Sequence, residues 1–344
     1  MADKTHIEWT DATWNPITGC SVVSPGCTNC YAMKLAGTRL QHHQSRAGLT
    51  TMSKAGPVWT GEVRFNEQWL DQPLRWKKPR MIFVCAHGDL FHDDVPDEWI
   101  DKVFAVMALC PRHTFQVLTK RPDRMREYLS GDRFADGHAS ERIGYAAMEL
   151  AGYHEEGDGT RAPSWPVDHT IISGLIHGPT PNIKEVVFKR PDMWPLPNVW
   201  LGVSAEDQAR ADERIPLLLD SPAAVRWISA EPLLGGINMQ PWLDRLDWVV
   251  AGGESGSNAR PMHPDWARSL RDQCAAAGVA FHFKQWGEWV SVSEVEGDGP
   301  HHKFPDGATV RRIGKKAAGR HLDGVTHDAY PRVPTHDPAQ RREV

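Results

Sequence analysis

The sequence predicts an α/β fold, a full or partial (β/α) barrel, and three observations support this. Short apolar runs rich in β-branched and aromatic residues alternate with amphipathic stretches along much of the 344 residues. The apolar runs are nearly continuous, which is typical of strands buried on both faces of a parallel sheet. About seven strand–helix units can be counted, and this number suits a barrel or partial barrel better than a small open sheet.

The strands are expected at six apolar runs, preceded by a short strand ahead of Gly19. The six runs are residues 81–85 (MIFVC), 114–118 (TFQVL), 199–203 (VWLGV), 225–228 (VRWI), 248–251 (WVVA) and 279–283 (VAFHF). Amphipathic helices are expected over residues 97–109, 205–219 and 264–277. Their start signals are Pro96, Ser204 or Ala205, and the pair His263-Pro264.

The chain divides into a barrel-like core over residues 1–292 and a C-terminal extension over residues 293–344. Residues 130–197 are rich in Gly, His, Asp and Pro and interrupt the strand–helix rhythm, so they are interpreted as an irregular insertion. The extension is polar and rich in Gly and Pro, and we expect it to wrap around the core. Its last residues (PTHDPAQRREV) are expected to fray.

Composition and charge exclude several classes of protein. The 39 Lys+Arg against 44 Asp+Glu give a formal charge of -5 and a pI of about 6.4, unlike a protein that coats DNA, although a local basic groove stays possible. No signal peptide and no long apolar span is recognised, which predicts a cytoplasmic protein without membrane contact. Six cysteines, three of them close together, suit a metal site in a reducing compartment better than a disulfide framework.

The three clustered cysteines are Cys20, Cys27 and Cys30, in a loop that contains Pro25 and Gly26. A structural zinc site usually takes four ligands in two separated pairs, whereas here one Cys-x-x-Cys has a single upstream thiol. Three thiolates would leave one iron of a 4Fe-4S cluster without a protein ligand, and a reactive cluster needs such an open position. Two alternatives stay open. One is three reduced cysteines without metal, and the other is a zinc site completed by His42, His43 or Cys85.

Charged and small residues follow the expected strands, where the carboxyl ends of parallel strands form one rim. Three successive strands end in a small-small-Glu triplet, at residues 204–206, 229–231 and 252–254. Helix capping alone would favour Ser and Glu at such positions, but it does not explain the neighbouring cations and glycines. We therefore expect a polar ligand pocket whose members include Asp89, Lys120, Arg121, Glu206, Glu231, Gly252, Gly253, Glu254, Ser255 and Lys284, with Phe91 or Trp286 available for stacking.

Taken together, these motifs resemble the phage and bacterial three-cysteine-motif family, considered distant relatives of radical SAM enzymes near the spore photoproduct lyase branch. The likeness rests on Cys20, Cys27 and Cys30 followed by Tyr31-Ala32, and on the strand ends GDLF, TKRP, SAEPLLG, GGESG and KQWG. It extends over most of the chain and includes GKKAAGRHLDG in the C-terminal extension.

The resemblance implies a radical SAM-like barrel and a particular chemistry. Cys20, Cys27 and Cys30 would hold a 4Fe-4S cluster that binds S-adenosylmethionine, and an external one-electron reductant would drive its cleavage to a 5'-deoxyadenosyl radical. A nucleotide or nucleic acid is the first guess for the substrate. Asp89 would contact the methionine amino group and residues 252–255 (Gly252, Gly253, Glu254, Ser255) the adenosyl part, while the catalytic candidates are Lys120, Glu206, Glu231 and Lys284.

The cysteine loop departs from the radical SAM pattern in two features. Six residues separate the first two cysteines, where three are usual, and Asn29 stands where an aromatic residue usually precedes the third cysteine. The GGE triplet at 252–254 comes late in the chain, whereas the superfamily's own motif follows the second strand.

A second hypothesis is a zinc- or cluster-stabilised phage protein that binds nucleic acid without catalysis. Its motivation is the 15 tryptophans, the basic run RWKKPR at residues 75–80, and Lys315-Lys316. Hydrolase motifs such as G-x-S-x-G and H-E-x-x-H are absent, and His87 beside Asp89 is the one histidine singled out as a possible acid-base group. Several tryptophans are expected in the core: Trp69, Trp76, Trp99, Trp200, Trp227 and Trp248.

Overall fold

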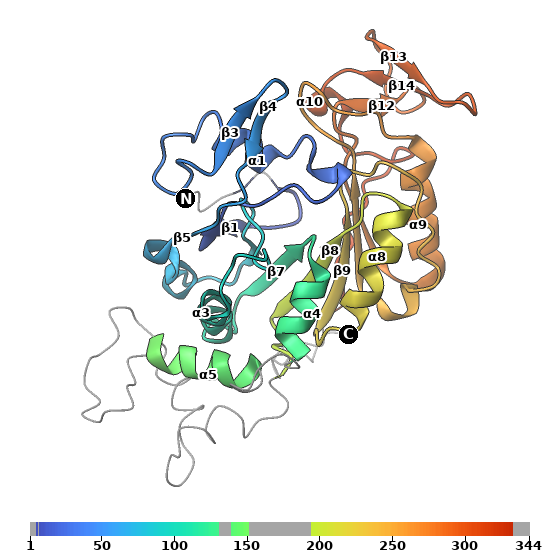
Figure 1. Cartoon of the computed structure of the whole chain (residues 1–344). Helices are drawn as coiled ribbons and strands as arrows, with labels where there is room; N and C mark the ends of the chain where they lie inside the picture. The colour runs from blue at the N-terminus through green and yellow to red at the C-terminus, as the bar shows by residue number, and fades with distance from the viewer. Residues whose placement is uncertain (1–4, 6, 131–138, 151–193, 333–344) are drawn as a thin grey trace, which may run out of the picture.

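A seven-stranded parallel sheet curls into a half-barrel in the computed structural model, which describes residues 5, 7–130, 139–150 and 194–332 (Figure 1). Each strand runs parallel to its neighbours, and β1 and β11 form the two edges, so the barrel is open on one side. The prediction of a barrel-like α/β fold is thereby confirmed in its partial form. The strands, in sheet order, are β1 (Ala12–Trp14), β6 (Met81–Val84), β7 (Thr114–Thr119), β8 (Val199–Ser204), β9 (Val225–Ala230), β10 (Trp248–Gly252) and β11 (Ala280–Gln285).

Helices connect successive strands and cover the outer face of the sheet (Figure 1). They are α3 (Asp97–Ala108), α4 (Pro122–Ser130), α5 (Ala139–Leu150), α8 (Gln208–Leu219) and α9 (Pro264–Ala277). The expected start of the helix after β8 was wrong. Ser204 is the last residue of β8, and the Asp207 side chain caps the helix by accepting a hydrogen bond from the Arg210 backbone N–H at 3.0 Å.

The expected irregular insertion at residues 130–197 contains a regular helix, which corrects that interpretation for α5. This helix packs on α3, where Arg142 Nε lies 3.3 Å from Asp101 Oδ2. Asp101 also accepts a hydrogen bond from the Tyr128 hydroxyl of α4 at 2.6 Å. The helix therefore belongs to the crossover between β7 and β8, while residues 131–138 and 151–193 lie outside the described part of the chain.

Tryptophans fill the inner face of the half-barrel, opposite the helices. Trp9 from the N-terminal segment packs edge-on against Phe83 and Trp227, with ring centroids 4.8 and 5.3 Å apart. Trp200 and Trp248 complete this cluster, which contains no residue from a helix. The core positions expected for Trp200, Trp227 and Trp248 are confirmed, and burial accounts for part of the tryptophan excess.

The segment between β1 and β6 carries the three cysteines and several short elements. The loop of residues 20–30 contains the 3-10 helix η1 (Pro25–Cys27) and leads into α1 (Tyr31–Ala36). The helix α1 packs on β4 (Figure 1). The remaining elements of this segment are β2 (Ile17–Thr18), β3 (Thr50–Ser53), β4 (Gly56–Trp59), β5 (Arg64–Phe65), η2 (Glu67–Trp69) and α2 (Gln72–Arg75).

The C-terminal part forms a small antiparallel sheet and then returns to the edge strand β11. The sheet has the order β12 (Trp289–Ser291), β14 (Thr309–Arg312), β13 (His301–Lys303), and α10 (Lys315–Ala318) follows it. The backbone N–H of Phe283 in β11 donates to His327 O at 2.9 Å, and Trp248 Nε1 donates to Ala329 O at 2.9 Å. The returning segment thus lies along β11. A further 3-10 helix, η4 (Leu243–Arg245), precedes β10. None of the described helices has the length and apolarity to cross a membrane.

Candidate functional site

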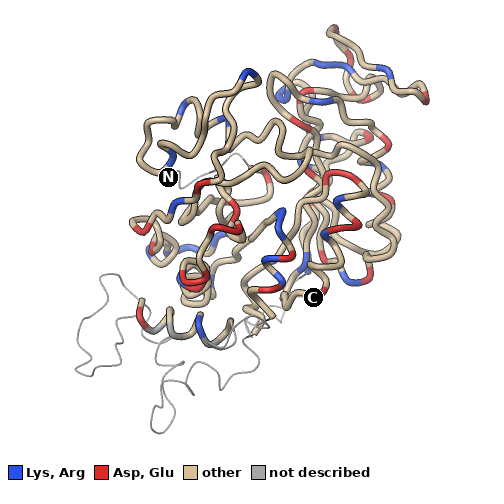
Figure 2. Tube along the Cα trace, in the orientation of Figure 1, with Lys and Arg blue, Asp and Glu red and all other residues tan. Residues whose placement is uncertain are grey.

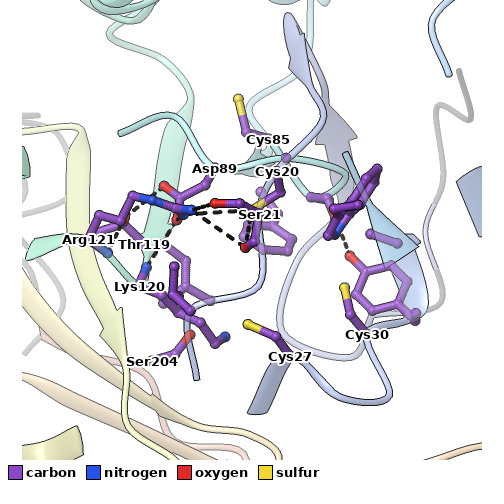
Figure 3. A pocket seen from close by; sticks show the side chains of 18 residues that line it. Cys20, Ser21, Cys27, Cys30, Cys85, Asp89, Thr119, Lys120, Arg121 and Ser204 are labelled. Atoms are coloured by element: carbon purple, nitrogen blue, oxygen red, sulfur yellow. Dashed lines mark hydrogen bonds and ion pairs between the residues drawn. The ribbon is translucent and has the colours of Figure 1, made fainter. Parts of the chain in front are cut away.

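A cavity of about 140 Å³ opens where β6, β7 and β8 end, and all three cysteines of the loop line it (Figure 3). Asp89 and Lys120, both expected at this rim, line it as well. A cavity needs about 10–15 Å³ on the same measure to hold one water molecule. The space therefore suits a bound group larger than a single ion. The sequence predicted this convergence, because a loop that follows the first strand opens on the rim formed by the other strand ends.

The three thiols differ in burial and in their neighbours. Cys27 is buried, whereas Cys20 and Cys30 are half-buried, and all are free of disulfide bonds. Cys20 Sγ accepts a hydrogen bond from Arg121 Nη1 at 3.6 Å. Burial, with a contribution from the Asp89 carboxylate, raises the pKa of Cys20 to about 12, although Arg121 opposes the rise. Cys20 is thus a neutral thiol near pH 7, and any metal bound there must displace its proton.

The spacing of the sulfur atoms is wider than a single zinc ion requires. Tetrahedral zinc with bonds of about 2.3 Å to sulfur would hold its thiolates about 3.8 Å apart. The thiols of Cys20, Cys27 and Cys30 do not form a set of ligand atoms that all lie within 4.8 Å of one another. At least one pair is therefore farther apart than that. The three thiols are therefore not gathered around the position of a single ion in this structure.

The side chains considered as further zinc ligands are not directed at the three thiols. Neither His42 nor His43 lines the cavity, and His43 Nδ1 is hydrogen-bonded to Ser45 Oγ at 2.7 Å. Cys85 lines the cavity, but Figure 3 shows its sulfur pointing away from Cys27 and Cys30. Burial raises the pKa of this thiol to about 12. In the described part of the chain, none of His42, His43 and Cys85 is therefore placed as a fourth zinc ligand beside the three thiols.

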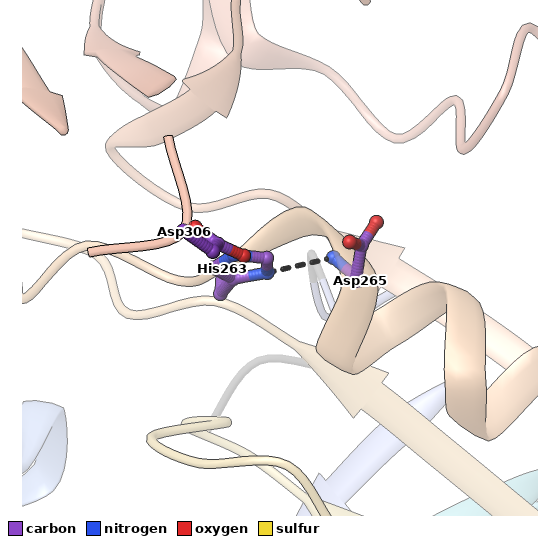
Figure 4. A group of neighbouring side chains, drawn as sticks. All are labelled: His263, Asp265 and Asp306. Atoms are coloured by element: carbon purple, nitrogen blue, oxygen red, sulfur yellow. Dashed lines mark hydrogen bonds and ion pairs between the residues drawn. The ribbon is translucent and has the colours of Figure 1, made fainter. Parts of the chain in front are cut away.

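One group of three possible metal ligands lies elsewhere, at the start of α9. His263, Asp265 and Asp306 bring ligand atoms within 4.8 Å of one another. His263 Nδ1 accepts a hydrogen bond from the Asp265 backbone N–H at 3.1 Å, and its Nε2 donates to Asp306 Oδ2 at 2.8 Å. Figure 4 shows the Asp265 carboxylate directed away from the ring. Because both ring nitrogens already have partners, these residues cap α9 and attach the C-terminal sheet to it.

Asp89 links the loops after β6 and β7. Its Oδ1 accepts hydrogen bonds from Thr119 Oγ1 at 2.7 Å and from the Phe91 backbone N–H at 3.1 Å. Its Oδ2 accepts from the Lys120 backbone N–H at 3.1 Å and forms a buried ion pair with Arg121 at 3.0 Å. Both carboxylate oxygens are therefore engaged within the protein, and the expected contact with a methionine amino group would have to share them.

Lys120 is the one catalytic candidate from the sequence that lines the cavity. Its side chain points toward the space between Ser204 and Cys27 (Figure 3). Its backbone N–H bonds to Asp89, but the described part of the chain offers its ammonium group no ion pair. An unpaired cation at this place can bind an anionic group of a ligand.

Apart from Arg121, which lines the cavity, the other predicted rim residues lie outside the lining and contact one another or the cysteine loop. Glu206 and Glu254 bond to residues of that loop, and Glu231 forms an ion pair with Lys284 at 3.2 Å. Gly252 and Gly253 permit close packing, because a Cβ at Gly253 would lie 1.9 Å from Trp286 O and one at Gly252 2.7 Å from the Glu231 carboxylate. Ser255 Oγ accepts a hydrogen bond from Gln285 Nε2 at 3.1 Å.

The structure gives His87 and Arg121 properties that the sequence did not predict. Burial and the nearby Arg46 lower the pKa of His87 to about 4, so this histidine is neutral near pH 7. Arg121, which the sequence placed at the rim without a specific role, connects Asp89 to Cys20 and Ser21. Its position directly after Lys120 at a strand end was the available signal. Thr119, Ser21 and Ser204 are further lining residues. Thr119 and Ser204 stand in strand-end motifs of the sequence, whereas nothing in the sequence singled out Ser21.

The fold and this site define the class: an α/β half-barrel protein with three thiols around one cavity at the carboxyl ends of its strands. A family model described as "Protein of unknown function (DUF5131)" matches residues 4–331. The chain therefore belongs to this family. No match was found among curated proteins or among solved structures.

Proposed function

We propose that the protein is a radical SAM-type iron-sulfur enzyme that reductively cleaves S-adenosylmethionine, with Cys20, Cys27 and Cys30 as cluster ligands. The observation that carries the proposal is that these three thiols line one cavity at the carboxyl ends of a half-barrel's strands. When bound, the cluster would supply the electron that cleaves the sulfonium and yields a 5'-deoxyadenosyl radical.

The charges around the cavity support such a group. Three thiolates placed in a partly buried loop repel one another, and nearby cations favour their charged form. Arg121 lies 3.6 Å from Cys20 Sγ, and the Lys120 ammonium extends into the same cavity. Three sulfur ligands with two cations beside them would hold such a cluster and would leave one iron without a protein ligand.

The remaining lining residues suit a zwitterionic ligand that must be kept from water. Lys120 offers a partner for a carboxylate, and Ser204 at the carboxyl end of β8 adds a hydroxyl. Phe83, Leu118 and Trp59 form an apolar part of the wall, which limits the access of water to a reactive species. We propose a nucleotide or nucleic acid as the substrate class, on the family resemblance alone.

A SAM-cleavage assay tests the proposed activity. Anaerobically reconstituted full-length protein, treated with dithionite and S-adenosylmethionine, is expected to form 5'-deoxyadenosine, which chromatography quantifies. Cys30→Ala should abolish the product because the cluster loses one of its ligands. Cys110→Ala is the matched control, since Cys110 is buried beyond the end of α3 and does not line the cavity. An iron-loaded wild type that forms no 5'-deoxyadenosine would contradict the proposal.

The alternative of a non-catalytic nucleic-acid-binding protein receives less support from the tryptophans and the charges. Trp9, Trp227 and Trp248 are buried within the half-barrel, where they cannot stack on bases. Arg80 lies over the Trp76 ring, 4.6 Å from its centroid, so part of the basic run at residues 75–80 packs on the protein itself. Lys and Arg are interspersed with Asp and Glu along the described trace (Figure 2).

A further inference from the structure

Two carboxylates from strand ends hold the cysteine loop, one on each side of Cys27. The first belongs to Glu206, just beyond β8, whose Oε1 accepts a hydrogen bond from the Gly26 backbone N–H at 3.0 Å. Glu206 is fully buried, and its Oε2 lies 3.1 Å from Arg214 Nη1. The ion pair with Arg214 compensates the buried charge and keeps the carboxylate in place.

The second carboxylate belongs to Glu254, just beyond β10. Its Oε2 accepts a hydrogen bond from Asn29 Nδ2 at 2.9 Å, and Asn29 lies between Cys27 and Cys30. The Arg260 backbone N–H and side chain bond to the same carboxylate, at 2.8 Å and 2.9 Å. Burial alone would raise the pKa of Glu254, but the hydrogen bonds from Arg260 and Asn29 outweigh it and lower the pKa. Glu254 therefore stays charged near pH 7.

The approach of Glu206 to the loop is close, so that a side chain at position 26 would crowd the carboxylate. A Cβ at Gly26 would lie 3.0 Å from the Glu206 carboxylate. The start of the loop is held as well, because Ser21 Oγ accepts a hydrogen bond from Arg121 Nη2 at 2.5 Å and lies 3.0 Å from His92 Nε2. Contacts from the ends of β6, β7, β8 and β10 thus converge on a loop of eleven residues.

The third triplet of the same kind serves a different purpose. Glu231, just beyond β9, forms an ion pair with Lys284 of β11 at 3.2 Å. In the described part of the chain it has no hydrogen bond with residues 20–30. Three identical residue types at three neighbouring strand ends therefore divide into two that bind the cysteine loop and one that does not.

We propose that Glu206 and Glu254 are positioning residues of the cysteine loop, which fix the backbone on both sides of Cys27 so that its thiol faces the cavity before any cofactor binds. Neither lines the cavity, so both act through Gly26 and Asn29. The identity of the bound group rests on the proposed function, whereas the positioning itself does not. A loop fixed in advance lowers the ordering cost of binding.

Asn29→Asp tests the contact with Glu254. The change replaces the amide, which donates to Glu254 Oε2 at 2.9 Å and to Asn258 O at 3.0 Å, with a carboxylate. Both hydrogen bonds are lost, and two like charges stand face to face. Loss of such a charge-assisted bond is expected to raise the labelling rate of the Cys27 thiol about 10-fold in metal-free full-length protein, as followed by a maleimide reagent and peptide mass spectrometry. Asn238→Asp is the matched control, because it makes the same charge change on an exposed residue whose Oδ1 still accepts from the Gln240 backbone N–H.

Gly26→Ala tests the contact with Glu206 from the loop side, and it keeps both charged residues of the buried Glu206–Arg214 pair. It is expected to raise Cys27 labelling as well and to lower iron and sulfide uptake on reconstitution. Wild-type labelling rates in both variants would overturn the positioning role, whatever metal the protein binds. A wild type that takes up no iron, with faster labelling in both variants, would refute the cluster and retain the positioning role.

Discussion

At the scale of single residues, Lys120 is the charge with which the cavity can recognise an anion. Arg121 beside it is engaged with Asp89 and Ser21, whereas the Lys120 ammonium has no ion-pair partner in the described part of the chain. The position of Lys120 is fixed from its backbone, which donates to Asp89 at 3.1 Å. The side chain can therefore act on a ligand without being needed for the fold.

Lys120→Met is expected to weaken binding of S-adenosylmethionine about 10- to 100-fold, since a charge-assisted hydrogen bond to its carboxylate would be lost. Equilibrium dialysis of the reconstituted protein measures the dissociation constant. Lys54→Met, in the exposed turn between β3 and β4, provides the control and should bind as the wild type does. Equal affinities in the two variants would show that Lys120 does not contact the ligand.

Single residues of the site were predictable where local pattern carries the information. The three cysteines, Lys120 and Asp89 were expected at one rim and do line one cavity. The contacts of Glu206 and Glu254 were not predictable, because their partners lie 180 and 225 residues earlier in the chain. The partner of Glu206 is the backbone N–H of Gly26, and every residue except proline carries such a group, so the residue type does not reveal the contact.

At the scale of elements, β8 shows how one glycine shapes the half-barrel. Gly202 lies in the middle of this buried strand, and a Cβ there would lie 2.4 Å from the Trp227 ring of the neighbouring strand. The indole occupies the space that a side chain at position 202 would fill. The strand thereby accommodates the tryptophan cluster on the inner face.

Gly202→Ala is expected to lower the free energy of unfolding by about 1–3 kcal/mol, because the added methyl group overpacks a rigid aromatic neighbour. Urea denaturation followed by tryptophan fluorescence measures the change. For comparison, Gly236→Ala adds the same methyl group 3.4 Å from Trp266, an ordinary contact distance. A Gly202→Ala protein as stable as the Gly236→Ala protein would mean that the Trp227 ring can move aside at little cost in free energy.

Most strands were predicted to within two residues, because each is a continuous apolar run buried by both layers. The start of α8 was misplaced because Ser204 and Asp207 are both good cap residues, and only the packing of β8 decides between them. The helix α5 was missed because Gly, His and Asp dominate the sequence around it. Its contact with α3 is a tertiary feature that composition does not report.

At the scale of the whole molecule, buried neutral histidines link stability to pH. Burial, with help from Arg112, lowers the pKa of His113 to about 4. Burial and Arg320 lower that of His282 to about 4 as well. In the unfolded chain both would take up a proton near pH 6.5. The unfolded state thus binds more protons between pH 6.5 and 4, so stability is fully present above that window and falls as the pH drops through it.

The His113→Gln variant is expected to lose less stability on acidification than the wild type, by about 2–3 kcal/mol between pH 7 and pH 4. Its amide can still donate to Pro73 O, which lies 3.1 Å from His113 Nε2. Urea denaturation at a series of pH values measures the slope, and the exposed His301→Gln change serves as the comparison. A slope identical to that of the wild type would mean that His113 is not the source of the acid sensitivity.

The central claim is that three thiols in one cavity hold one iron-sulfur cluster, and the most direct test is the iron and acid-labile sulfide content per chain of anaerobically prepared protein. We predict about four of each in the wild type and in Cys110→Ala. A clear loss is predicted when Cys20, Cys27 or Cys30 is replaced by Ala. Stoichiometric zinc without iron, or an iron content that survives replacement of all three cysteines, would contradict the claim.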